Sequence, residues 1–102
     1  MAALAAESVK RVTLELGGKS ASVVLPDADM AAAVKGTLAA CFLNSGQTCS
    51  AHTRMLVPES RYEDIKALLQ AGIAKYPLGT SFDENTRLGP LITATQRERV
   101  TG

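Results

Sequence analysis

Apolar residues form short extended runs that alternate with longer helical patterns along the chain. Residues 2–10 have the small, apolar pattern of a helix, and residues 12–16 predict a short strand that a glycine pair ends. Residues 22–25 predict a second strand, which stops at Pro26, and residues 54–57 predict a third. The strands are therefore separated by segments long enough to hold helices.

The longest helical pattern lies between the second and third predicted strands. It covers residues 28–43, with Asp27 or Asp29 as the N-cap. Nearly every residue in it is small or apolar, and Lys35 is its only charge beyond Asp29. We expect such a helix to be buried on most sides. A chain of 102 residues has little material with which to cover it.

Helices in the second half of the chain begin at capping patterns. Ser60 with Glu63 three residues later predicts a helix that runs to about Lys75. Residues 77–92 are rich in turn formers and predict a long loop. A second capping pattern begins at Thr93 and opens a last helix.

This order of elements predicts the α/β class, with a partial parallel sheet and flanking helices. Helical patterns reach both ends of the sequence, and the first of them has no capping residue before it. Together with the apolar helix that needs cover, these patterns predict a fragment of a larger domain. We expect the chain alone to expose an apolar patch and to associate or aggregate.

Charge and composition exclude several function classes. The chain has 11 Lys and Arg against 10 Asp and Glu, a net charge of +1. Binding to nucleic acid or an anionic membrane needs a basic surplus, so neither partner is expected. No apolar run approaches the roughly 18–20 residues that cross a bilayer, and no secretory signal pattern follows Met1. Two cysteines make no disulfide framework, which favours a cytoplasmic protein with reduced thiols.

Cys49 stands out as a candidate nucleophile. It follows a polar loop over residues 44–48, where Gly46 and Gln47 are expected to shape the turn that presents the thiol. The thiolate of an exposed cysteine is a strong nucleophile, although an isolated loop cysteine is commonly inert. Cys41 lies on the apolar helix and is expected to act as a small hydrophobe. Cys49 and His52 supply only two zinc ligands where a closed site takes four, so no metal is expected.

Glu15 is the second candidate. It lies at the end of an apolar predicted strand, shortly before Gly17 and Gly18, where the backbone can approach another segment closely. A carboxylate in apolar surroundings is either paired or functional. One interpretation is an ordinary ion pair with Lys19 or Arg11, and the other is a general base.

Taken together, the two motifs resemble the active-site signatures of the NAD(P)-dependent aldehyde dehydrogenase superfamily. The first is Leu-Glu-Leu-Gly-Gly-Lys-Ser around Glu15, and the second is Phe-x-x-x-Gly-Gln-x-Cys ending at Cys49. Their order and spacing are those of the family. The resemblance continues through Arg54 and the Gly89-Pro90 turn, so it covers nearly the whole chain.

The resemblance implies a catalytic role for each motif. Cys49 would attack an aldehyde and pass through a thioester, and Glu15 would activate the water that hydrolyses it. The backbone of Leu16 would lie beside the nicotinamide of NAD or NADP, with most of the cofactor site outside this chain. Residues 1–16 would end the cofactor-binding domain and residues 17–102 would open the catalytic domain. The full-length enzyme would be a homo-oligomer.

Two alternative interpretations of the chain's function remain open from the sequence. No glycine-rich phosphate loop precedes Glu15, so we expect no NAD-linked aldehyde oxidation by these 102 residues alone. The chain could then be a non-catalytic remnant that packs on a partner. A CoA-acylating relative would also keep Cys49, but its chemistry has no need for the base Glu15.

Overall fold

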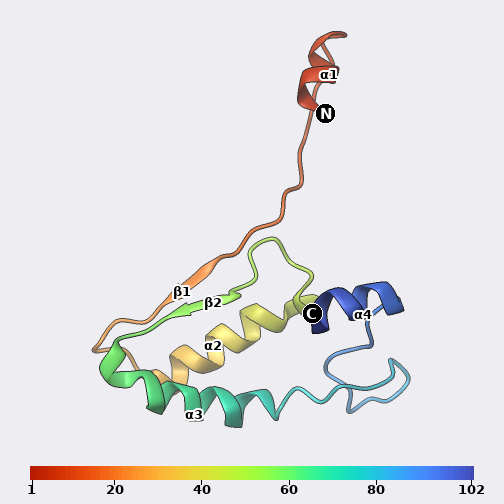
Figure 1. The fold of residues 1–102 in the computed structure, drawn as a ribbon. Helices are drawn as coiled ribbons and strands as arrows, with labels where there is room; N and C mark the ends of the chain where they lie inside the picture. The colour runs from red at the N-terminus through yellow and green to blue at the C-terminus, as the bar shows by residue number, and fades with distance from the viewer.

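The computed structural model describes residues 1–102, and its centre is a parallel pair of short strands covered on one side by helices. Strand β1 (Ala21–Val23) pairs with β2 (Arg54–Leu56), and Ala21 lies opposite Arg54. Helix α2 (Met30–Phe42) connects the two strands, as Figure 1 shows. This strand–helix–strand unit is the expected α/β arrangement, so the predicted class and the parallel pairing are confirmed.

Helix α3 (Tyr62–Ile73) packs along α2, and the two helices hold the core between them. Ile65 is the most deeply buried large side chain, with 2% of its surface exposed. On the strand side, the hydroxyls of Ser22 and Thr37 share a hydrogen bond of 2.7 Å that joins β1 to α2. The core cluster consists of Val24, Met30, Val34, Leu38 and Ile65.

The helix caps agree with the sequence at two of three positions. The Asp29 side chain accepts a hydrogen bond from the backbone of Ala32 at 3.1 Å, and Thr93 does the same for Gln96 at 3.2 Å. The expected cap at Ser60 is wrong. Residues Glu59–Arg61 form a 3₁₀ turn, η2, so Ser60 lies inside that turn and α3 begins at Tyr62 without a side-chain cap.

The N-terminal part of the chain extends away from the core, as the upper part of Figure 1 shows. Helix α1 (Ala2–Ala6) is shorter than the predicted helix over 2–10. The predicted strand over 12–16 is also wrong, because these residues have no neighbouring strand with which to pair. A strand exists only where its backbone groups find partners, however favourable its side-chain pattern is.

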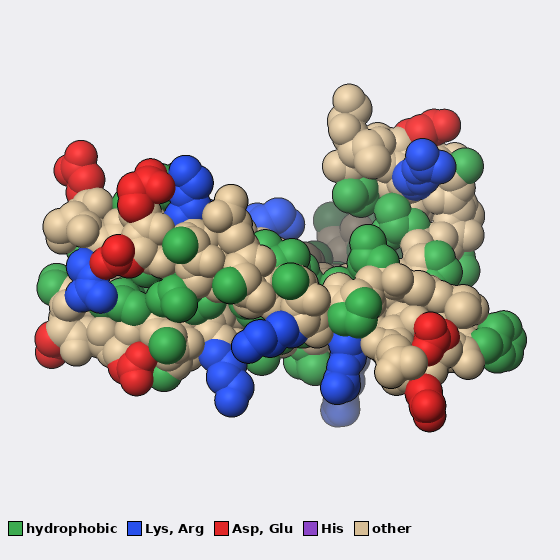
Figure 2. Space-filling view, turned by 90° about the horizontal axis from the view of Figure 1, so that it is seen from below, with side chains coloured by type: hydrophobic (Ala, Val, Ile, Leu, Met, Phe, Trp, Pro, Cys, Tyr) green, Lys and Arg blue, Asp and Glu red, His purple; other side chains and the backbone are tan.

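Much apolar surface is exposed to solvent, as expected for a short chain with an apolar helix that it cannot fully cover. Only 7 of 102 residues are buried, and α2 is buried along one side rather than on most sides. Figure 2 shows apolar side chains in view across the lower face. The radius of gyration is 18.0 Å, against about 13 Å for a compact domain of this length.

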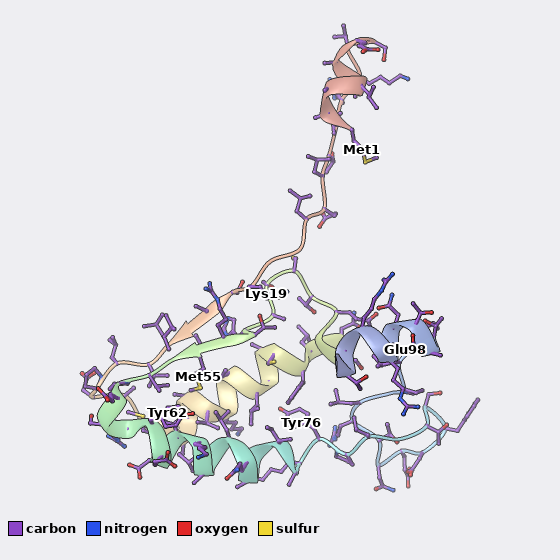
Figure 3. All side chains as sticks on the ribbon, viewed as in Figure 1. Met1, Lys19, Met55, Tyr62, Tyr76 and Glu98 are labelled. Atoms are coloured by element: carbon purple, nitrogen blue, oxygen red, sulfur yellow. The ribbon has the colours of Figure 1, made fainter.

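The C-terminal part is a long loop followed by a short helix. Residues 77–92 form the expected loop, and an isolated β-bridge between Leu78 and Leu88 joins its two arms. Helix α4 (Ala94–Thr101) ends the chain. The ring of Tyr76, labelled in Figure 3, lies 4.9 Å from that of Phe42 and closes the far end of the α2–α3 pair. No helix here has both the length and the apolar character needed to cross a membrane.

Candidate active site

The parallel pairing of β1 and β2 brings both sequence motifs to one edge of the sheet. In a parallel pair, the segments that enter the strands meet at the same end. Here these segments carry Glu15 and Cys49, and they line one open hollow of about 390 Å³. Figure 3 shows Lys19 where the two segments meet. The hollow is lined by Glu15, Leu16, Gly17, Gly18, Lys19, Gln47, Thr48 and Cys49.

The loop that presents Cys49 is folded by its own polar groups. Asn44 and Ser45 have positive φ values of 52° and 57°, and Gly46 follows at 79°, so the chain reverses sharply after α2. Glycine and asparagine adopt this conformation readily, whereas serine does so at some cost. The side chains of Asn44 and Gln47 each donate to the other's backbone carbonyl, at 3.3 and 3.2 Å. The expectation that Gly46 and Gln47 shape this loop is confirmed.

Thr48 closes the same loop, a role that no pattern in the sequence indicated. Its hydroxyl donates at 3.2 Å to the carbonyl of Leu43, the residue at the C-cap of α2. On the far side of Cys49, the buried Ala51 donates from its backbone to the Thr48 carbonyl at 3.1 Å. Cys49 is therefore held between two anchored neighbours.

The two segments touch at Gly18. A Cβ atom built on Gly18 would lie 2.8 Å from the carbonyl oxygen of Cys49, closer than real Cβ atoms approach. Only glycine allows the backbone to come this near, as the sequence suggested for this position. The same expectation is wrong for Gly17, where an added Cβ meets nothing within 4 Å. The glycine pair thus has one member at the contact and one in open space.

Accessibility separates the two cysteines as expected. Cys49 is exposed and Cys41 is half-buried, and both are free thiols. Glu15 is exposed, which differs from the apolar surroundings expected for it, because nothing in this chain covers residues 10–19. Neither Lys19 nor Arg11 pairs with Glu15, since the only ion pairs are Arg61–Asp64 and Lys66–Glu63, which lie around the start of α3.

An accessible thiol and an unpaired carboxylate line the same hollow, so each can carry out a different step of a reaction at a carbonyl carbon. The thiolate can form a covalent bond to the carbonyl carbon, and the carboxylate can take a proton from water. Leu16 also lines the hollow, and 71% of the residue's surface is exposed, so this chain leaves it open to a flat ligand such as a nicotinamide ring. The residues present therefore fit one edge of a cofactor site.

Comparison with known proteins defines the family. A family model described as "Aldehyde dehydrogenase family" matches residues 1–102, and the chain belongs to this family. Mitochondrial succinate-semialdehyde dehydrogenase from Arabidopsis thaliana is 45% identical over 98 residues, which are 96% of this chain and 19% of that protein.

Solved structures agree with the sequence match. Aldehyde dehydrogenase C from Pseudomonas syringae, in a complex with NAD+ and octanal, is similar with a TM-score of 0.88 and 46% identity. An NADP-dependent enzyme from E. coli is similar with a TM-score of 0.86 and 38% identity. The matches cover 97% and 93% of this chain, respectively, and 20% of each of those chains. The chain thus spans about a fifth of the length of the relatives it matches.

Proposed function

We propose that this chain carries the nucleophile and the general base of an aldehyde dehydrogenase that oxidises an aldehyde to a carboxylic acid with NAD or NADP. The observation that carries the proposal is the single hollow that Glu15 and Cys49 both line. Family membership supports the reaction class, and the exposed thiol supports the role of Cys49.

In the first half of the proposed reaction, the Cys49 thiolate attacks the carbonyl carbon of the aldehyde. The carbonyl π-bond opens and leaves a tetrahedral thiohemiacetal with an oxyanion. The backbone N–H of Cys49 makes no hydrogen bond within the chain, so it is free to donate to that oxygen. One such donor is worth about 3–4 kcal/mol in related acyl-transfer sites. Loss of hydride from the carbon then gives a thioester on Cys49.

Bound NAD or NADP would supply the acceptor for that hydride. Leu16 is the residue of this chain that would contact the nicotinamide, because it is exposed and lines the hollow. The relatives with bound NAD+ or dependence on NADP support the cofactor class. On this proposal, residues 1–16 end the cofactor-binding domain and residues 17–102 open the catalytic domain.

In the second half, Glu15 removes a proton from water as the water oxygen attacks the thioester carbon. The carbon–sulfur bond breaks, the acid leaves, and the Cys49 thiolate is restored. Glu15 is exposed and has no ion-pair partner, so its carboxylate is available for this proton. A positioned general base accelerates such a step by about 10²–10⁴-fold.

An activated ester tests the nucleophile without the cofactor. p-Nitrophenyl acetate would transfer its acetyl group to Cys49 and release coloured p-nitrophenolate in a burst of one equivalent. We expect Cys49→Ser to abolish the burst and Cys41→Ser to preserve it, because only the first thiol borders the hollow. A burst that survives in Cys49→Ser would contradict the assignment of the nucleophile.

A further inference from the structure

Arg54 connects the two halves of the site. Its Nε donates a hydrogen bond of 2.9 Å to the carbonyl of Lys19, across 35 positions of sequence. Lys19 directly follows Gly18, the residue that touches the Cys49 carbonyl. Arg54 also begins β2, the strand that follows the nucleophile's loop. One guanidinium therefore joins the strand after Cys49 to the segment that carries Glu15.

No other hydrogen bond holds that segment to the rest of the chain. Residues 11–19 belong to no helix or strand, and none of their backbone groups bonds to another backbone group. The Lys19 ammonium donates only to its own neighbour, the Gly18 carbonyl, at 3.2 Å. Beyond Lys19, the Ser20 carbonyl accepts a hydrogen bond of 3.4 Å from the backbone N–H of Arg54, and sheet pairing begins at Ala21. Ahead of the backbone anchor at Ser20, the path of residues 11–19 thus depends on the Arg54 side chain and on the contact at Gly18.

The loop of Cys49, in contrast, does not depend on Arg54. Its fold is fixed by Asn44, Gln47 and Thr48, which bond among themselves and to the end of α2. Removing the Arg54 guanidinium therefore leaves the loop of Cys49 intact and releases residues 11–19, the segment that carries Glu15. The two halves of the reaction should respond differently to this change.

We infer that Arg54 is a positioning residue that holds the Glu15 segment against the nucleophile's loop. The inference rests on the proposed function, because it assigns Arg54 an effect on the step in which Glu15 acts. A residue that only stabilised the sheet edge would alter both steps together. Arg54 instead sets the rate at which the Cys49 thioester is hydrolysed and leaves the rate at which it forms unchanged.

The test follows acetyl-Cys49 over time by intact-protein mass spectrometry after a pulse of p-nitrophenyl acetate. The variants are Arg54→Ala, Arg54→Lys, Glu15→Gln and the pair Arg54→Ala with Glu15→Gln. Arg99→Ala on α4 is the matched control, because Arg99 makes no side-chain hydrogen bond or ion pair. The p-nitrophenolate burst measures acylation in the same samples.

We expect Arg54→Ala to lengthen the lifetime of acetyl-Cys49 by about five- to tenfold, the ratio that one net hydrogen bond provides. The burst rate should stay at the wild-type value. Arg54→Lys should recover part of the loss, since an ammonium can still donate to the Lys19 carbonyl. Arg54→Ala should add nothing to Glu15→Gln, because both changes remove the same assistance.

Each failure has its own signature. If Glu15→Gln slows hydrolysis and Arg54→Ala does not, the inference is wrong and the proposed function stands. If Arg54→Ala slows the burst and hydrolysis equally, Arg54 is only a structural residue of the sheet edge. If Glu15→Gln leaves the lifetime unchanged, the proposed role of Glu15 is wrong, and the inference falls with it.

Discussion

Replacing Gly18 with alanine places a methyl group against the backbone of the proposed nucleophile. The new Cβ would lie 2.8 Å from the Cys49 carbonyl oxygen, and the obstacle is backbone rather than the end of a mobile side chain. Ordinary contact begins near 3.4 Å, so one segment must move by about half an ångström. The segment that carries Glu15 should be the one that moves, since only one hydrogen bond ties residues 11–19 to the core, whereas several hold the loop of Cys49.

The size of the effect follows from that displacement. Catalytic groups must stay within about 0.5 Å of their productive geometry, and a 1 Å misplacement costs about 10²-fold. We therefore expect Gly18→Ala to lengthen the lifetime of acetyl-Cys49 by about tenfold. Acylation of Cys49 should change little, because its loop is held by its own hydrogen bonds.

Gly17→Ala is the internal control for this prediction. A methyl group at Gly17 meets nothing within 4 Å and requires no movement of either segment. Mass spectrometry of the acetylated chain compares both variants with the wild type. Equal lifetimes for Gly17→Ala and Gly18→Ala would refute the close approach as the feature that sets the distance between base and thiol.

Two further predictions concern the thiols and the core. Iodoacetamide should label Cys49 faster than Cys41, because Cys49 is exposed and Cys41 is half-buried on α2. Peptide mapping after a short pulse measures both labelling rates, and equal rates would contradict this placement of the two thiols. Ile65→Ala should lower the free energy of unfolding by about 2–5 kcal/mol and weaken the helical signal in circular dichroism, because Ile65 is the most buried side chain of a five-residue core. An unchanged helical signal would show that other contacts hold α2 and α3 together.

The features that the sequence predicted correctly are those decided within a few residues. Asp29 and Thr93 cap their helices because the acceptor and the backbone donor lie three residues apart. Ser60 has the same pattern, yet it lies inside the 3₁₀ turn that follows Pro58, so its side chain does not cap α3. A local pattern thus predicts a cap only when no competing turn forms first.

The features that the sequence did not predict depend on contacts between distant segments. Residues 12–16 have a strand pattern, but a strand also needs a partner, and none is present for them. The Arg54–Lys19 hydrogen bond spans 35 positions, and no spacing rule reaches that far. The meeting of Glu15 and Cys49 at one hollow follows from the parallel register of β1 and β2, which the motifs alone do not specify.

The lifetime of acetyl-Cys49 in the Glu15→Gln variant tests the central claim most directly. Glutamine keeps the size of the side chain but cannot take a proton from water, so the acyl group should persist on Cys49. Peptide mass spectrometry should find it there after the wild type has lost it, with a lifetime longer by about 10²-fold or more. Equal lifetimes in the variant and the wild type would show that Glu15 and Cys49 share a hollow without sharing a reaction.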